Sequence, residues 1–203
     1  MCIRDSHKAV ADRLARGQVV ARCFGRMEYG PRALGHRSIL YQTNDSSVNH
    51  WLNERLKRTD FMPFAPATLA EHADDCYQDL NGVRDTTRFM TVTVACKSSM
   101  AAKSPGAVHV DGTARPQIVD RETAPDFHAI LSEYQARTGV PSLLNTSFNM
   151  HEEPIVCTPD DAIRAFLAGN LDWLALGDYM IEGTGVGTEG RSGSVAQGLG
   201  EEG

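Results

Sequence analysis

The chain has 203 residues, enough for one substantial domain. Its 41% hydrophobic and 23% charged residues are typical of a soluble protein with a packed core. A net charge of −6 argues against general nucleic-acid binding, so any anion site must be a local cluster of basic side chains. The five cysteines are widely separated and form no CxxC pair, which argues against a zinc site or disulfide scaffold and for a reducing cytoplasm. No apolar run approaches the ~20 residues that span a bilayer.

Two kinds of pattern predict the elements of the first half of the chain. Apolar residues at helical spacing, closed by glycine or preceded by a capping serine, indicate helices. Short runs of β-branched and aromatic residues indicate strands, most clearly where Phe89, Met90, Val92 and Val94 partly alternate. In chain order we expect a helix over 7–16, a strand over 18–24, a helix over about 46–58, an extended segment over 63–69 and a strand over 88–96.

The second half repeats these patterns and adds two segments of a different kind. Strands interspersed with helices favour the α/β class, with α+β as the alternative, and an open mixed sheet. Residues 183–203 contain eight glycines and few apolar side chains, so a disordered tail is expected there. In chain order we expect a mobile loop over 97–107, two extended segments over 108–120 around an Asp111-Gly112 turn, a helix over 124–137 ended by Gly139, a strand over 141–145, a helix over 159–168 capped by Thr158 and a strand over 173–176.

The segment 25–40 carries the strongest functional signal. Glycine lets a backbone turn tightly and approach a ligand, and arginine offers a rigid charged fork that matches phosphate or carboxylate oxygens. This combination predicts a loop that holds a phosphorylated anion; the alternative is three surface arginines near ordinary turns. Three glycines stand five residues apart, each followed within two residues by an arginine: Gly25, Gly30 and Gly35, with Arg26, Arg32 and Arg37.

Polar residues follow the strand predicted at 141–145. Asn145, Ser147 and Asn149 carry short amide and hydroxyl groups that can orient phosphate or sugar hydroxyls at the end of a strand. The alternative is a polar turn before Pro154.

Two basic clusters lie elsewhere. Lys57 and Arg58 end a predicted helix, where a mobile lysine charge can follow a phosphoryl group or both residues can simply satisfy the helix dipole. Arg115 can complete an anion clamp, and nearby His109 is either a titrating group or a structural histidine. The histidines show no HxxxH or HExxH spacing, so no metal site is predicted.

Together these clusters resemble the carboxy-terminal domain of the O-carbamoyltransferases, the family of nodulation-factor, cephamycin and tobramycin carbamoylation enzymes. The resemblance implies that residues 7–182 form a YrdC-like domain, an open twisted α/β sheet with a basic concavity. Residues 1–6 do not match and are expected to be a truncated or artificial start. The matching stretches are 25–40, 57–66, 109–119, 143–156 and 176–179.

The resemblance implies an ATP-dependent reaction. Carbamoyl phosphate and ATP, accompanied by Mg²⁺, give carbamoyl-adenylate and pyrophosphate, and the carbamoyl group then passes to a small-molecule hydroxyl. In the family, transfer belongs to an amino-terminal ATPase-like domain with an HxxxH metal site. This chain lacks that domain, so a fragment of a cytoplasmic enzyme is expected. The alternatives are an inactive module that binds phosphate, nucleotide or RNA, and threonylcarbamoyl-adenylate synthesis, which the 25–40 motif disfavours.

The resemblance also implies roles for individual residues. Arg26 and Glu28 are expected to pair and hold the loop. Many relatives have arginine where Met62 stands, so one pocket charge is missing here or its work shifts to Arg58. The resemblance implies Arg32, Lys57 and Arg115 as catalytic residues, and Arg37, Arg58, Asn145, Ser147 and Asn149 as substrate- or nucleotide-binding residues, with no metal ligand.

Overall fold

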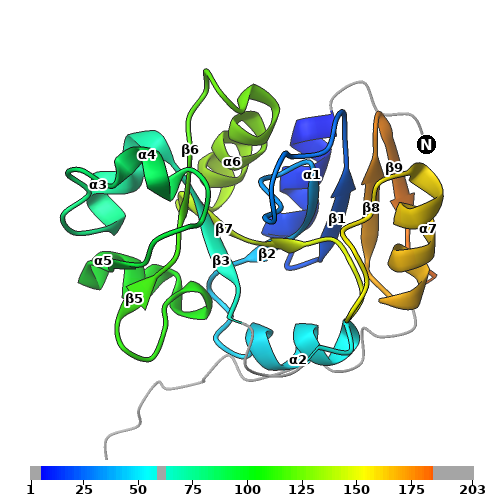
Figure 1. Ribbon diagram of the computed structural model, residues 1–203, viewed down its shortest axis with the longest axis horizontal. Helices are drawn as coiled ribbons and strands as arrows, with labels where there is room; N and C mark the ends of the chain where they lie inside the picture. Colours follow the sequence, from blue (N-terminus) through cyan, green and yellow to red (C-terminus); the bar gives the residue numbers. More distant parts are fainter. Residues whose placement is uncertain (1–5, 59–62, 185–203) are drawn as a thin grey trace, which may run out of the picture.

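A single seven-stranded sheet organises the protein in this computed structural model, which describes residues 6–58 and 63–184 (Figure 1). Its strands lie in the order β6-β3-β7-β2-β1-β8-β9. β1 is parallel to β8 and β3 to β6, whereas the other neighbours are antiparallel, so the predicted mixed sheet is confirmed. The strands are β1 (Val20–Cys23), β2 (Arg37–Gln42), β3 (Ala65–Leu69), β6 (Gln117–Val119), β7 (Ser142–Ser147), β8 (Trp173–Leu176) and β9 (Tyr179–Glu182).

Helices cover both faces of this sheet. In Figure 1, α1 (Ser6–Ala15) and α6 (Pro125–Thr138) lie above the sheet, and α2 (Val48–Arg55) lies below it. The apolar side of α7 (Pro159–Ala168) joins the same hydrophobic cluster as α2. The layers therefore follow the α/β expectation.

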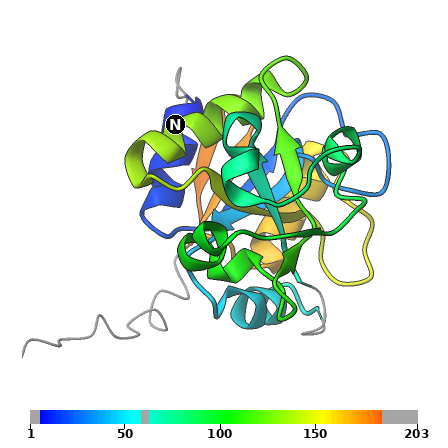
Figure 2. The same ribbon diagram turned by 90° about the vertical axis from the view of Figure 1, so that its left-hand side faces the viewer.

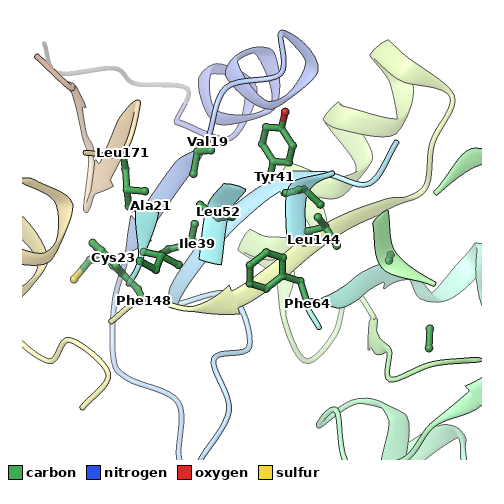
Figure 3. Close-up of a cluster of buried hydrophobic side chains, with 14 of the residues drawn as sticks. Val19, Ala21, Cys23, Ile39, Tyr41, Leu52, Phe64, Leu144, Phe148 and Leu171 are labelled. Carbon is green, nitrogen blue, oxygen red and sulfur yellow. The ribbon is translucent and has the colours of Figure 1, made fainter. Parts of the chain in front are cut away.

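Alternation along the strands separates two hydrophobic cores. Ile39 and Tyr41 of β2 face the cluster that includes Leu52 of α2 and Leu144 of β7 (Figure 3). Leu40, between them, belongs to the second cluster with residues of α1 and α6. Because successive strand side chains point to opposite faces, one strand supplies both cores.

Small elements gather beyond the β3–β6 end of the sheet. Figure 2 shows them in front of the sheet in green. They are η1 (Ala70–His72), α3 (Ala73–Cys76), α4 (Arg84–Thr87), β4 (Val94–Ala95), α5 (Ser98–Lys103), η2 (Pro105–Ala107) and β5 (Thr113–Ala114), with β4 and β5 forming a separate antiparallel pair.

Three predictions in this region were wrong. The strand expected at 88–96 shrinks to Val94–Ala95, because Met90 takes a left-handed backbone conformation (φ 54°) and Phe89 is 53% exposed. The loop expected at 97–107 contains α5 and η2. Extended segments were expected on both sides of the Asp111-Gly112 turn. The residues before the turn form no strand, and both β5 and β6 follow it.

The helices and strands outside this region lie within a few residues of their predicted positions, apart from two strands that were not expected. The short helices η1, α3 and α4 also had no counterpart in the prediction. Thr158 caps α7 and Gly139 ends α6 in a left-handed conformation, as expected. β2 begins inside the segment 25–40 that was interpreted as a loop and continues to Gln42, and β9 was not expected. Residues 185–203 of the expected tail, and residues 1–5, lie outside the described residues.

Strand direction brings distant segments to one end of the sheet. The register pairs Cys23, the last residue of β1, with Arg37, the first of β2. Ser147, the last residue of β7, pairs with Ser38. The starts of β3 and β6 lie at the same end, because β3 runs antiparallel to β7 and parallel to β6. The loops that follow β1 and β7 project on the same side in Figure 2, in blue and yellow.

Candidate functional site

A small pocket lies at this shared end of the sheet. Its cavity volume of about 70 Å³ leaves room for several water molecules, because ~10–15 Å³ measured with a water-sized probe already holds one. The pocket therefore has room for a small polar or charged group of a ligand. Its walls are Pro31, Arg32 and Ala33 from the β1–β2 loop, Pro63, Phe64 and Ala65 at the start of β3, Asn145, Thr146 and Ser147 at the end of β7, and Met90 and Arg115.

Arg32 and Arg115 give the pocket its positive charge. Arg115 is half-buried, and both this burial and the nearby charge of Arg32 lower the pKa of its guanidinium. Arginine nevertheless stays charged at neutral pH. Within residues 6–58 and 63–184, no carboxylate forms an ion pair with either side chain. Two like charges beside an uncompensated pocket favour an anionic ligand.

Glu28 holds the loop that carries Arg32. Its Oε1 accepts hydrogen bonds from the backbone N–H groups of Leu34 (2.6 Å), His36 (2.8 Å) and Arg37 (3.2 Å). The expected pair between Arg26 and Glu28 is therefore wrong for the described residues: Glu28 binds the backbone, and Arg26 is exposed. A carboxylate can replace the N–H partners that a sharply turning loop otherwise lacks.

Arg37 lies outside the pocket, although the sequence suggested a phosphate contact. Its side chain is 6% exposed, and its Nη atoms donate to backbone carbonyls on both loops of this sheet end. The acceptors are Phe24 (2.9 Å), Gly25 (3.0 Å), His36 (3.2 Å) and Cys157 (3.2 Å). Arg37 thereby ties the β1–β2 loop to the segment before α7.

Arg22 supports the same loop and was missed by the sequence reasoning. It is buried in β1, donates to the carbonyl of Gly35 and lies 4.5 Å from the ring centre of Phe24. Burial lowers the pKa of Arg22 to about 10. One signal was available, since a charged residue within an otherwise apolar strand requires buried partners.

Arg58 forms a support behind the β7 end of the pocket. Its guanidinium donates to Thr146 Oγ1 (2.9 Å), the Ser147 carbonyl (2.8 Å) and Asn149 Oδ1 (2.8 Å). Ser147 Oγ also donates to Asn149 Oδ1 at 2.6 Å. Burial lowers the pKa of Arg58 to about 10. Arg58 and Asn149 therefore position Ser147, which lines the pocket, without lining it themselves.

Asn145 connects three segments of the site. It is 1% exposed, and its Nδ2 donates to the Ala33 carbonyl (3.1 Å) and to Gln117 Oε1 (2.8 Å). Gln117 in turn donates from Nε2 to the Leu34 carbonyl at 2.9 Å. This chain of bonds fixes the β1–β2 loop against β7 and β6. Gln117 was not singled out from the sequence because a lone glutamine in a short strand carries no pattern.

The remaining candidates lie away from the pocket walls. Lys57 is exposed at the turn after α2, where its φ is 56°. His109 Nδ1 lies 3.0 Å from Thr113 Oγ1, within the turn before β5. Met62, where many relatives have arginine, lies outside the described residues. The pocket therefore brings together Arg32, Arg115, Asn145 and Ser147, but not Lys57 or Arg37.

Met90 and Phe64 add an apolar side to the pocket that the sequence reasoning missed. Both are buried. Met90 was assigned to the wrongly predicted strand at 88–96, so its position at the pocket was not expected. Its left-handed backbone is uncommon for a non-glycine residue. In the described part of the chain, no group of three potential metal ligands occurs. The helices described there include none long and apolar enough to span a membrane.

The sequence comparison identifies the family. The profile described as "Carbamoyltransferase C-terminus" matches residues 11–183. The chain belongs to this carbamoyltransferase family. Nodulation protein NolO of Bradyrhizobium diazoefficiens is 39% identical over 178 residues, which make up 87% of this chain and 32% of NolO. The chain thus spans about a third of the curated relatives it matches.

Solved structures support the fold assignment for this carbamoyltransferase domain. Full-length HypF in its phosphate- and nucleotide-bound form aligns over 87% of this chain and 21% of HypF, with a TM-score of 0.59 and 18% identity. A doubly substituted Sua5 of P. abyssi aligns over 86% of this chain and 50% of Sua5, with a TM-score of 0.59 and 11% identity. At these identities the likeness concerns the fold alone, and it confirms the YrdC-like architecture.

Proposed function

We propose that this carbamoyltransferase domain activates a carbamoyl group with ATP. Water releases phosphate from carbamoyl phosphate, the carbamate oxygen displaces pyrophosphate from the α-phosphorus of ATP, and carbamoyl-adenylate results. The carbamoyl group then passes to a hydroxyl of a small molecule. The observation that carries the proposal is the pair of arginines without carboxylate partners in the small pocket of a carbamoyltransferase family domain.

The proposed reaction requires the site to neutralise the negative charge of its substrates. Carbamoyl phosphate and ATP bring many negative oxygens into one site, and fixed positive groups offset their repulsion and stabilise charge in the transition state. Arg32 and Arg115 supply that charge at the pocket. Ser147 offers a neutral hydroxyl there, and Mg²⁺ is expected to accompany the nucleotide.

We assign the small charged groups of the substrates to this pocket. A carbamoyl or phosphoryl group fits within it, and we place the rest of the nucleotide outside the described walls. Lys57 follows α2 outside those walls, and we retain it as a phosphoryl-binding lysine on the family resemblance. Arg37, Arg58 and Asn149 act as positioning residues, because their donors or acceptors hold the loops that carry the pocket.

Partners and compartment complete the proposal. On the family resemblance, we assign transfer to the acceptor hydroxyl to an amino-terminal ATPase-like domain; the chain spans about a third of the curated relatives it matches, which is consistent with this assignment. The cysteines at positions 23, 76, 96 and 157 are unpaired, which supports a reducing cytoplasm.

Arginine substitution tests the proposed function directly. Arg32→Ala and Arg115→Ala in the full-length enzyme should reduce carbamoyl-phosphate-dependent pyrophosphate release at least 100-fold, because each removes a charge that faces phosphate oxygens. Circular dichroism and thermal melting should show an intact fold, since neither side chain has a carboxylate partner in the described residues.

Arg26→Ala is the matched control. Arg26 lies on the same loop and is exposed, but it does not line the pocket, so pyrophosphate release should stay within about twofold of wild type. Unchanged release in both pocket variants would refute the proposal. If wild type binds carbamoyl phosphate but releases no pyrophosphate, the domain is an inactive binding module instead.

A further inference from the structure

The amide of Asn145 has hydrogen-bond partners at its nitrogen and none at its oxygen among the described residues. Its Nδ2 is held by the Ala33 carbonyl and by Gln117 Oε1, at 3.1 Å and 2.8 Å. Gln117 cannot reverse without losing its own bond from Nε2 to the Leu34 carbonyl. Two backbone carbonyls therefore set the orientation of both amides. Within residues 6–58 and 63–184, Asn145 Oδ1 is buried and has no hydrogen-bond partner, and Asn145 is one of the residues that line the pocket.

An unpaired buried acceptor calls for a donor from the ligand. A buried carbonyl oxygen without a partner is costly, so such atoms in a site are candidates for ligand contact. Phosphate oxygens, which accept hydrogen bonds, cannot satisfy it. The carbamoyl group differs from other acyl groups of its size because it carries an NH₂, which donates and does not accept. The purine amine is also a donor, so the experiments below compare two acyl phosphates, neither of which carries a purine.

We propose that Asn145 Oδ1 accepts a hydrogen bond from the carbamoyl amine and selects carbamoyl phosphate over acetyl phosphate. This inference rests on the proposed function. Arg32 and Arg115 recognise the phosphate, which the two acyl phosphates share, whereas Asn145 recognises the NH₂ that acetyl phosphate replaces with a methyl group. The same contact remains available after carbamoyl phosphate has become carbamate, because the amine is retained throughout activation.

The first test compares two ligands on the wild-type 203-residue chain. Calorimetric titration should give a dissociation constant at least about tenfold lower for carbamoyl phosphate than for acetyl phosphate, because a methyl group leaves Oδ1 unpaired. Equal affinities would overturn the inference. This measurement needs no substitution, so equal affinities would refute the inference even if a variant does not fold.

The second test separates recognition from loop support. Asn145→Leu removes the acceptor at similar volume, and the ratio of the two dissociation constants should fall to about one. Gln117→Met is the matched control: it removes the bond to the Leu34 carbonyl but leaves Asn145 Oδ1 and its Nδ2 bond to Ala33. In this control both affinities should change together, with the ratio preserved.

The outcomes distinguish the inference from the proposed function. If Asn145→Leu weakens both ligands in parallel and preserves their ratio, Asn145 only supports the loop and the inference fails, while carbamoyl-phosphate binding stands. If the folded wild-type chain binds neither ligand, the proposed function fails and the inference fails with it.

Discussion

The guanidinium groups around the pocket serve two purposes, which their surroundings distinguish. Arg22, Arg37 and Arg58 are buried, and they donate to carbonyl oxygens or short polar side chains. Burying a charge is costly unless hydrogen bonds compensate it, and the bonds of these three side chains fix the loops, although Arg37 Nε has no partner among the described residues. Arg32 and Arg115 have no carboxylate partner among the described residues, so their charges remain available to an anion.

Gly35 is the loop position where a side chain is least tolerated. Its φ is 116°, and a Cβ there would lie 2.5 Å from Cδ1 of Phe127, which is buried in the α6 core. Gly35→Ala should lower the free energy of unfolding by about 3 kcal/mol, from backbone strain and overpacking together. Chemical denaturation measures this loss.

Gly30→Ala controls for the backbone contribution alone. Gly30 has a φ of 123° but no atom within 4 Å of the corresponding Cβ. Its loss should be about 1 kcal/mol, the cost of the conformation without the clash. Equal losses in the two variants would contradict a role for the contact with Phe127.

At the scale of elements, α7 begins with a reciprocal cap that the sequence signalled. Thr158 Oγ1 accepts from the Asp161 N–H, and the Asp161 carboxylate accepts from the Thr158 N–H. The backbone and hydroxyl bonds of Thr158 lower the pKa of Asp161 below its ordinary value of 3.8. Asp161 therefore stabilises the fold only while it is ionised.

This cap predicts a pH-dependent contribution to stability. Because the folded pKa is the lower one, the contribution is fully present above the unfolded pKa of about 3.9 and is lost as pH falls through the folded pKa. Asp161→Asn removes the titrating group, so its melting temperature should lie below wild type from pH 7 to 5 and approach it below about pH 4.

The adjacent Asp160 provides the control for this titration. It shares the first turn of α7 but makes no reciprocal bond with Thr158. Asp160→Asn should leave the pH profile of the melting temperature close to that of wild type. A gap between wild type and Asp161→Asn that persists unchanged to pH 2 would rule out the ionised cap as its cause.

Local signals account for what the sequence predicted, and tertiary contacts account for what it did not. The Thr158 cap of α7 and the left-handed Gly139 that ends α6 each depend on residues close together in the sequence. Both helices were therefore predicted. Phe89 and Val92 have strand propensity, but the left-handed backbone at Met90 interrupts the predicted strand, and Met90 lines the pocket. At the site, the sequence singled out Arg32 and Arg115, which line the pocket, whereas the buried hydrogen bonds of Arg37 depend on carbonyls up to 120 residues away.

At the scale of the whole molecule, one sheet connects two cores. β2 and β7 supply side chains to both hydrophobic clusters, so neither core can form without the strands of the other. The pocket lies where the ends of these strands meet the loops. Loss of either core should therefore disrupt the sheet and the site together, and unfolding should be a single cooperative transition.

The two tryptophans test this coupling from opposite sides of the sheet. Trp51 packs against the α2 core, 5.1 Å from the ring of Tyr41, and Trp173 belongs to the core of α1 and α6. Trp51→Phe and Trp173→Phe each leave one fluorescent probe. Within each variant, urea midpoints from fluorescence and circular dichroism should coincide, even if the two variants differ in stability. Circular dichroism of the wild-type chain provides the reference, since it reports both layers at once. Separate midpoints within one variant would mean that the two cores unfold independently, so that the sheet does not couple their unfolding.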